Sequence, residues 1–336
     1  MKLFLKIIRF KEWYDSKWNI YLFIFLLFYI RHIDYNIWYV LRGLVAIMSF
    51  SFFLLSFGYS FNDFSDVNED LIAGKSNYLT HFCRRKQVLI LLALAITCFI
   101  IPVSLFPSIE MAFIVILSII MAFLYSYRRF GIKQCGIWGL VVSSLAQRVC
   151  PLFAIFYIFY DWSFTSLLVT LLSFFIGLRW ILIHQAEDQG NDNISHTHSF
   201  VASLGSKVRL LSIITTIFVC ELLCLSVIFL QNARFSFSFV VPMVYLVFQL
   251  SMLPFWMKVG WTRMVISYDF APLADFYFLW LGIYLVLALT IHNTICIILL
   301  FPVLCFGYRY IILDYKYVKL SFLAKKGLLL PPSPKE

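Results

Sequence analysis

The sequence contains few charged residues and lacks the signatures of several enzyme classes. Charged residues make up 13% of the 336 residues, whereas a soluble domain carries about a quarter. We find no Gly-rich phosphate loop, no His-Glu-x-x-His zinc helix and no Ser-His-Asp arrangement. The Asp-Gly-x-x-Ala-Arg signature of CDP-alcohol phosphotransferases is also missing. A soluble fold and these four kinds of site are therefore not expected.

Cysteine pairs and a cleavable leader are absent as well. The eight cysteines form no Cys-x-x-Cys pair and mostly lie in apolar segments, so we interpret them as small buried hydrophobes. No cleavable signal peptide is evident, because basic residues are spaced along the first residues of the chain. We divide the chain into a cytoplasmic or interfacial N-terminus (1–17), a single transmembrane domain (18–315) and a cytoplasmic tail (316–336).

Apolar residues dominate what remains. They make up 62% of the chain, and the mean hydropathy is +0.89, which indicates a polytopic membrane protein. We therefore predict an all-α helical bundle of nine or ten transmembrane helices with a central cavity. The apolar runs that are long enough to span a bilayer, or nearly so, lie at about 18–31, 37–60, 87–106, 109–127, 135–160, 164–184, 208–230, 236–256, 274–291 and 293–312.

The basic residues predict the orientation. Of the 27 Lys and Arg residues, 21 fall in loops that share one side with the N-terminus when ten crossings are numbered. Basic loops face the cytoplasm, so both termini are expected there, and the net charge of +10 reflects topology rather than nucleic-acid binding. Four arginines fall within predicted helices, and two of them, Arg148 and Arg179, are functional candidates by position, although either can also pair with a carbonyl. A bacterial inner membrane suits a chain with no transit peptide.

Two short acidic segments follow two of the apolar runs on this cytoplasmic side. They span residues 62–70 and 187–192 and contain five of the 11 Asp residues. Carboxylates beside hydrocarbon usually serve a cation or a polar cavity. Along a helix, Asp63, Asp66 and Asp70 share one face.

These acids suit a hard divalent cation. Asn62 stacks on Asp66, and Asp188 on Asp192, each four residues apart. Mg²⁺ takes oxygen ligands, commonly one or two carboxylates together with water and substrate phosphates. Two facing acidic helices could therefore hold a diphosphate between metal ions, which would neutralise charge on the departing group.

The first segment resembles the first aspartate-rich motif of the UbiA-type intramembrane prenyltransferase superfamily. The matching pattern is Asn62-Asp63-x-x-Asp66-x-x-x-Asp70. The second motif of that family is commonly Asp-x-x-Asp-x-x-x-Asp. Asp188 and Asp192 match it, whereas Gln185 stands at the first Asp position, after His184.

A loop between the motifs extends the resemblance, which covers about residues 37–230. Tyr125-Ser126 and Lys133 are similar to parts of the family's Tyr-Ser-Pro-Pro-x-Arg-x-Lys loop. The prolines are absent, Arg128 and Arg129 stand in their place, and Gly131 replaces the Arg.

The resemblance implies a Mg²⁺-dependent prenyltransferase. A prenyl diphosphate would ionise in a cavity open to lipid, and a lipophilic, often aromatic, acceptor would capture the allylic cation with release of diphosphate. The roles implied are as follows: metal binding by Asn62, Asp63, Asp66, Asp70, Asp188 and Asp192; diphosphate binding by Lys75, Arg128, Arg129 and Lys133; catalysis by Asp66, Asp192, Tyr125 and Lys133; and polar contacts in the second motif by His184 and Gln185.

Other functions stay open at this point. Within the superfamily, Gln185 and the altered loop are compatible with terpene cyclisation or with phosphoribosyl transfer to a polyprenyl phosphate. An ion-coupled transporter is a further alternative, although its polar groups are expected near the middle of the membrane. Asp275 near a helix start either interacts with the helix dipole or shapes an acceptor pocket.

Overall fold

The computed structural model describes residues 2–72, 74, 76–127, 132, 135–194, 199–232, 237–267 and 271–325. Within these ranges every regular element is a helix. The predicted all-α class is therefore confirmed, and the length and apolarity of the helices identify an integral, multi-pass membrane protein.

Seven helices or helix combinations are long and apolar enough to cross a membrane. They are α3 (Ile37–Ser65), α5 (Arg84–Leu105), α6 (Ile109–Ser126), α7 (Ile137–Ser144) continued by η6 (Leu145–Val149) and α8 (Leu152–Phe159), α9 (Phe164–Ile194), α11 (Lys207–Gln231), and η8 (Thr294–Leu299) continued by α16 (Leu300–Lys325). An eighth span results if α12 (Phe237–Ser251) and α13 (Leu253–Val259), which bend by 64° at their junction, are counted as one. The predicted count of nine or ten helices stays a prediction.

The remaining helices are shorter. Two of them correspond to predicted spans, namely η2 (Tyr14–Trp18) with α2 (Asn19–Arg31) and η7 (Phe276–Trp280) with α15 (Leu281–His292). The others flank or connect the spans: α1 (Lys2–Ile7), η1 (Phe10–Glu12), α4 (Val67–Ile72), η3 (Tyr78–His81), α10 (Phe200–Leu204) and α14 (Trp261–Ile266).

Polar caps fix where several spans begin. The side chain of Asn36 accepts a hydrogen bond from the Trp38 backbone N–H at 2.8 Å, at the start of α3. Ser108 does the same for Met111 at the start of α6, at 3.0 Å. A side-chain oxygen at this position satisfies a backbone donor that the helix itself cannot pair.

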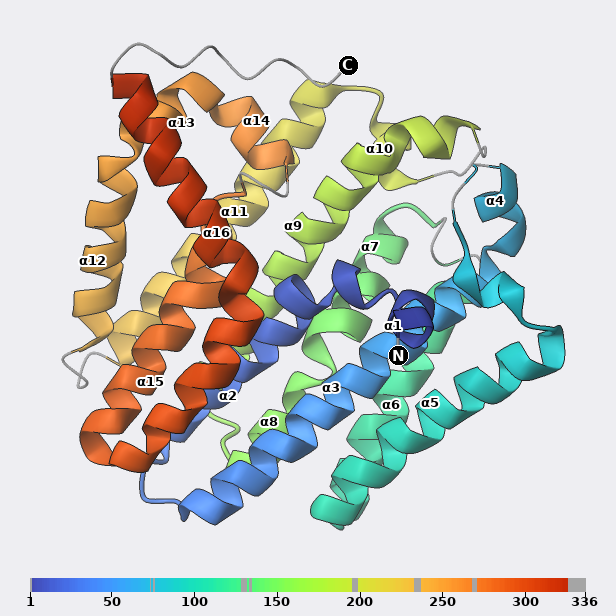
Figure 1. The fold of residues 1–336 in the computed structure, drawn as a ribbon, viewed down its shortest axis with the longest axis horizontal. Helices are drawn as coiled ribbons and strands as arrows, with labels where there is room; N and C mark the ends of the chain where they lie inside the picture. Colours follow the sequence, from blue (N-terminus) through green and yellow to red (C-terminus); the bar gives the residue numbers. More distant parts are fainter. Residues whose placement is uncertain are drawn as a thin grey trace.

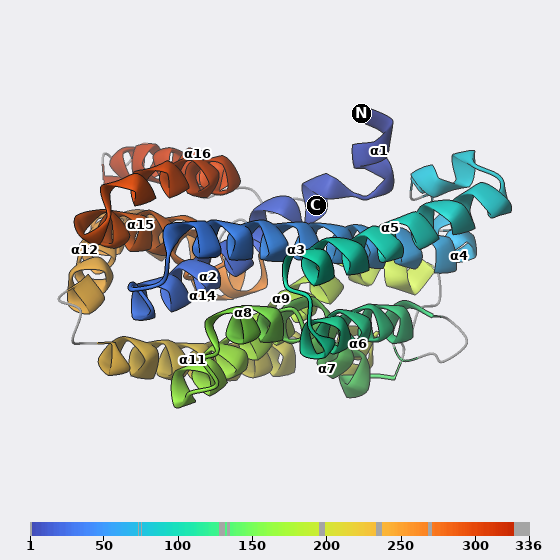
Figure 2. The same cartoon turned by 90° about the horizontal axis from the view of Figure 1, so that it is seen from below.

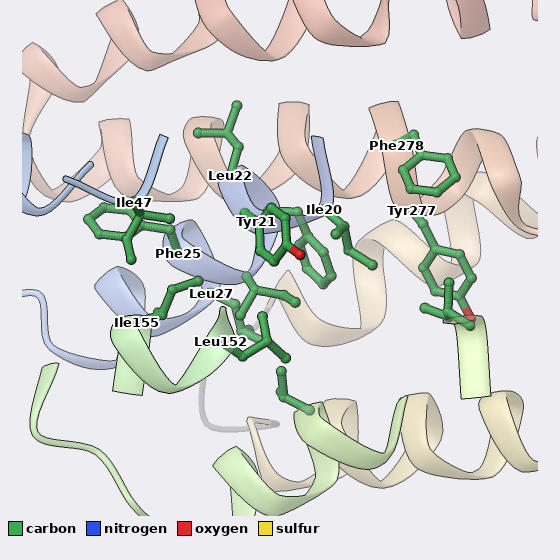
Figure 3. Packing of buried hydrophobic residues seen from close by; sticks show 14 of the residues in the cluster. Ile20, Tyr21, Leu22, Phe25, Leu27, Ile47, Leu152, Ile155, Tyr277 and Phe278 are labelled. Atoms are coloured by element: carbon green, nitrogen blue, oxygen red, sulfur yellow. The ribbon is translucent and has the colours of Figure 1, made fainter. Parts of the chain in front are cut away.

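The bundle is organised around α2. Every residue of α2 from Asn19 to Ile30 is buried, as expected for a helix that is apolar on all sides and enclosed by others. Viewed from below, α2 runs between α3 and the layer that contains α8 (Figure 2), and it also contacts α15. Figure 3 shows its side chains, including Phe25, packed beside Ile155 of α8 and Ile47 of α3.

A polar cluster closes one end of the bundle. Asp161, between α8 and α9, accepts hydrogen bonds from Arg31 at 3.2 Å and from the backbone N–H of Ser163 at 3.1 Å, and it contacts His32 at 3.0 Å. Burial alone would raise the pKa of Asp161, but the hydrogen bonds from Ser163 and His32 outweigh it, so this pKa lies below its usual range. The cluster ties the end of α2 to the turn before α9.

The two acidic segments lie at the opposite end of the bundle. In Figure 1, α3 and α9 both rise toward the right-hand side, where α3 leads into α4 and α9 leads toward α10. Segments about 125 residues apart in the sequence are therefore brought to one end of the molecule. This arrangement positions the candidate site.

Candidate metal–diphosphate site

The first acidic segment forms the end of α3 and the start of α4. Helix α3 ends at Ser65, and Asp66 is its C-cap. The backbone hydrogen bonds Asp66 N–H to Asn62 O and Asp70 N–H to Asp66 O, each 2.9 Å, keep helical spacing across the junction. Asn62, Asp66 and Asp70 therefore stay four residues apart on one side of a nearly continuous helix.

Asp63, on the same helix, pairs with the N-terminal segment. Its side chain is buried, with 3% of the residue exposed, and accepts a hydrogen bond from Arg9 Nη1 at 3.0 Å. Arg9 also bonds to Glu12, through Nε at 2.7 Å. Burial alone would lower the pKa of Arg9, but Glu12 and Asp63 raise it above its usual value. The Asp63 carboxylate is thus already neutralised by a cation from the N-terminal segment.

Asn77 holds the first motif from the other side. Its Nδ2 donates to Asp70 Oδ2 at 2.9 Å and to the backbone oxygen of Asp63 at 2.7 Å. The loop that precedes η3 therefore orients Asp70, in the way that outer hydrogen bonds orient metal-binding carboxylates.

The second acidic segment occupies the last turns of α9. His184 Nε2 lies 3.6 Å from Asp188 Oδ2, one turn away along the helix. Gln185 Oε1 accepts a hydrogen bond from the Val201 backbone N–H at 3.3 Å, so this residue also ties α9 to α10. The side chain of Asp192 lies outside the described residues.

A polar cavity of about 330 Å³ lies between the helices that carry the two motifs. Its walls include Tyr59, one turn before Asp63 on α3, and His184, one turn before Asp188 on α9. Both motif-bearing helices therefore line the same cavity. Its other polar walls come from η1, η2, α7, η6 and α16, and the residues are Lys11, Glu12, Ser16, Lys17, Ser143, Ser144, Gln147, Arg148, Arg309 and Tyr310.

Cations from the N-terminal segment gather over Tyr59. Arg9 lies 5.4 Å and Lys17 lies 4.9 Å from the centre of the Tyr59 ring, distances at which cation–π attraction acts. Arg9 and Glu12 are electrostatic neighbours of both Asp63 on α3 and His184 on α9. The N-terminal segment therefore reaches both motif-bearing helices.

Lys17 is a half-buried cation of this cavity. Its Nζ donates to Gln147 Oε1. Two effects together lower the pKa of Lys17 to about 7: burial, which is the larger, and the positive charge of Arg148. Arg148 in turn donates to the backbone oxygen of Ser16 at 3.0 Å. The charge in the cavity therefore changes within the physiological pH range.

Arg179, the other functional candidate among the arginines of predicted helices, is paired. Its Nε and Nη2 donate to the two carboxylate oxygens of Glu221 on α11, at 2.6 and 2.8 Å. A third donor, Nη1, reaches the Pro272 carbonyl at 3.2 Å. Both ionic side chains are at most 1% exposed, so the pair holds α9 and α11 together.

The predicted diphosphate ligands are not among the described residues. Lys75, Arg128, Arg129 and Lys133 all lie outside them. Tyr125 is described, at the end of α6, and it is an electrostatic neighbour of Tyr59. In the described part of the chain, no three His, Cys, Asp or Glu side chains come together as a metal site. The donor set Asn62, Asp66 and Asp70 consists of hard oxygens, which fit Mg²⁺.

Sequence reasoning missed the N-terminal contribution to the site. It assigned Arg9, Glu12 and Lys17 to an interfacial segment, because basic residues near a first helix are normally topology signals. It also passed over Gln147. Tyr59 could have been found from its place one turn before Asp63 on the same helix.

Comparisons with known proteins give one consistent result. A sequence profile of the UbiA prenyltransferase family matches residues 20–258. A comparison with curated proteins finds no match. Among solved structures, a UbiA homologue from Archaeoglobus fulgidus bound to DMAPP and Mg²⁺ has a TM-score of 0.55 at 12% identity, covering 94% of this chain and 99% of that one. The same homologue bound to GPP and Mg²⁺ has a TM-score of 0.54, with the same identity and coverage.

Proposed function

Because the chain belongs to the UbiA prenyltransferase family, we propose that it transfers a prenyl group from a prenyl diphosphate to a lipophilic acceptor, with Mg²⁺ as cofactor. The observation that carries this proposal is that Tyr59, one turn before Asp63, and His184, one turn before Asp188, line one polar cavity. The Archaeoglobus homologue of the same fold binds DMAPP or GPP together with Mg²⁺. We place the donor diphosphate between the two acidic segments.

In this proposal the oxygens of Asn62, Asp66, Asp70, Asp188 and Asp192 hold Mg²⁺. When bound, the metal supplies charge stabilisation for the departing diphosphate. Arg9 neutralises Asp63 at 3.0 Å, which limits the negative charge that a diphosphate would meet at the site. Asn77 holds Asp70 in place.

The proposed reaction breaks the bond between C1 of the prenyl chain and the diphosphate oxygen, whose electron pair leaves with diphosphate. A new bond forms between C1 and the acceptor nucleophile, which then loses a proton. Lys17, Arg148 and, in the flanking loops, Lys75, Arg128, Arg129 and Lys133 supply cations for phosphate oxygens. Tyr125 and Tyr59 lie beside this region, where aromatic faces favour a carbocation.

The orientation belongs to the same proposal. Because the basic loops gather on the side of the acidic segments, the site faces the cytoplasm. A water-soluble diphosphate leaves toward that side, while the prenyl chain stays in the bilayer.

Diphosphate release by the purified protein tests the proposal. We expect release from at least one donor between geranyl and geranylgeranyl diphosphate, with lipid extract as the source of acceptor, in Mg²⁺ but not in EDTA. Asp66→Asn should reduce the rate by at least about a hundredfold, since even residues that only support metal ligands carry effects of that size. Glu110→Gln, an exposed acid at the other end of the bundle, is the matched control and should keep the full rate.

The mass of the product separates the reactions that this superfamily performs. A product heavier than the acceptor by one prenyl unit supports transfer. A cyclic hydrocarbon formed without any acceptor would show instead that the protein catalyses cyclisation. Absence of release with every donor would contradict the proposal.

A further inference from the structure

A second cavity lies in the other half of the bundle. It measures about 560 Å³ and is bounded by α11, α12, α13, α14, the segment 271–275 and α16. The 64° bend between α12 and α13 creates it, because α13 turns away from α12 instead of continuing the span. Helices α13 and α14 lie at the upper edge in Figure 1, the edge that also holds α10.

The rim of this cavity is apolar and exposed. Leu253, Met257 and Trp261 line it, with exposed fractions of 47%, 69% and 44%. Trp256 and Tyr317 add aromatic walls, with ring centres 5.2 Å apart. Such walls accept a hydrocarbon body from the bilayer.

The polar end of the cavity is a fixed carboxylate. Asp275 accepts from the Tyr245 hydroxyl at 2.6 Å and from Gln249 Nε2 at 3.0 Å. Gln249 is itself held, because its Oε1 accepts from Trp256 Nε1 at 3.0 Å. Among the described lining residues, Asp275 is the one charged side chain. A rigid, oriented acceptor of hydrogen bonds thus terminates an apolar pocket.

A second carboxyl group, that of Asp314, lies next to Asp275. Asp314 on α16 lies within hydrogen-bonding reach of Asp275 and accepts from Trp280 Nε1 at 2.9 Å. Asp314 is only 8% exposed, and its Oδ1 has no hydrogen-bond partner in the described part of the chain. Two adjacent carboxyls repel an anionic head group and favour a donor.

From this geometry we propose that the second cavity binds an amphiphile from the bilayer whose head group donates hydrogen bonds and carries no negative charge. The apolar body lies against Trp256 and Trp261, and a hydroxyl or ammonium head donates to Asp275. The site is chemically distinct from one for prenyl diphosphate, whose head is anionic. It goes beyond the proposed transferase activity, and Tyr310, which lines both cavities, places its occupant beside the polar cavity.

Quenching of tryptophan fluorescence tests this site without any turnover. The probes are bromododecanol, bromododecylammonium and bromododecanoate, added to the full-length protein in nanodiscs, because bromine quenches tryptophan on contact. We expect saturable quenching by the alcohol or the amine with an affinity about tenfold or more above that of the carboxylate, the factor that one hydrogen bond to a charged group supplies. The Trp256→Phe and Trp261→Phe variants should each lose part of that signal.

Asp275→Asn combined with Asp314→Asn should abolish the preference over the carboxylate probe, because neither neutral amide repels it. Tyr245→Phe removes a donor from Asp275 but leaves its charge, so this variant should keep the preference. Equal, non-saturating quenching by all three probes in the unmodified protein would overturn the proposal, as would an unchanged preference in a folded variant that carries both Asp275→Asn and Asp314→Asn. Loss of diphosphate release with intact probe selectivity would instead count only against the transferase function.

Discussion

The buried ion pair between Arg179 and Glu221 allows a quantitative prediction about stability. The pair is bidentate, at 2.6 and 2.8 Å, and neither side chain is more than 1% exposed. Removing one partner of such a pair strands a buried charge and typically costs about 3–5 kcal/mol, whereas replacing both by apolar residues is often neutral. Unfolded helices in a membrane also find polar partners, so we expect the lower end of this range.

Arg179→Met and Glu221→Leu should therefore each lower the free energy of unfolding by about 3 kcal/mol. The double variant should lose less than either single variant, because no charge is left unpaired. The assay is unfolding by sodium dodecyl sulfate in mixed micelles, followed by circular dichroism. Arg209→Met, at an exposed site on α11, is the control and should shift the value by no more than about 0.5 kcal/mol.

A double variant that loses the sum of the two single losses would refute the reasoning. That result would mean that the two side chains act independently, and that α9 and α11 are held by packing alone. Loss of less than about 1 kcal/mol in Arg179→Met would lead to the same conclusion.

Three further predictions concern packing, the polar cluster and the cavity. Gly177→Ala should destabilise the protein by about 1–3 kcal/mol, because the added Cβ would clash with the facing α7 helix. Gly190→Ala on the same helix is the control and should not destabilise it, because a Cβ there meets nothing within 4 Å. Thermal unfolding in detergent measures both variants. Asp161→Asn should lower stability at pH 7 by about 1–3 kcal/mol relative to the exposed Asp34→Asn control. The pKa of Asp161 is lower in the folded protein than in the unfolded chain, where it is about 3.9. The stability that Asp161 contributes is therefore fully present above about pH 3.9 and is lost as the pH falls through the folded pKa. A pH series of the same unfolding assay would show this loss. Lys17 should bind prenyl diphosphate as a cation below pH 7 and lose that charge above it, so KM should rise between pH 6 and 8.5 more steeply in the unmodified protein than in Lys17→Met.

The sign of the Lys17 effect on stability also follows. Its folded pKa of about 7 lies below the unfolded value of about 10.4. Between these values the unfolded chain binds more protons, so stability should rise with pH across that window. A flat difference between the unmodified protein and Lys17→Met over this range would contradict the assigned pKa.

The sequence predicted most of the helices well, because the free energy of moving a helix into lipid depends on the hydropathy of a short stretch of consecutive residues. The runs near 37–60, 87–106, 109–127, 164–184 and 208–230 each correspond to a single long helix. It did not predict the bend in the run 236–256, because hydropathy carries no information about direction. The physical signal there was Pro254, which sits in the first turn of α13 and favours the start of a new helix.

Contacts between distant segments were the part that the sequence could not supply. Arg9 meets Asp63 across 54 residues, and Arg179 meets Glu221 across 42. Spacing rules work within one helix, whereas these pairs depend on how helices are arranged. The acidic motifs were found because their residues lie within single helices, and the roles of Asp66, Asp188 and Asp192 stay predictions.

The most direct test of the account is whether both acidic segments build one metal site. Mn²⁺ binds the same hard oxygen ligands as Mg²⁺, and its paramagnetic resonance signal reports binding to the purified protein. We predict that a non-hydrolysable prenyl diphosphate analogue tightens Mn²⁺ binding, and that Asp66→Asn and Asp188→Asn each abolish this effect while Glu110→Gln preserves it. Tight, analogue-dependent binding that survives in either the Asp66→Asn or the Asp188→Asn protein would contradict a single site shared by α3 and α9.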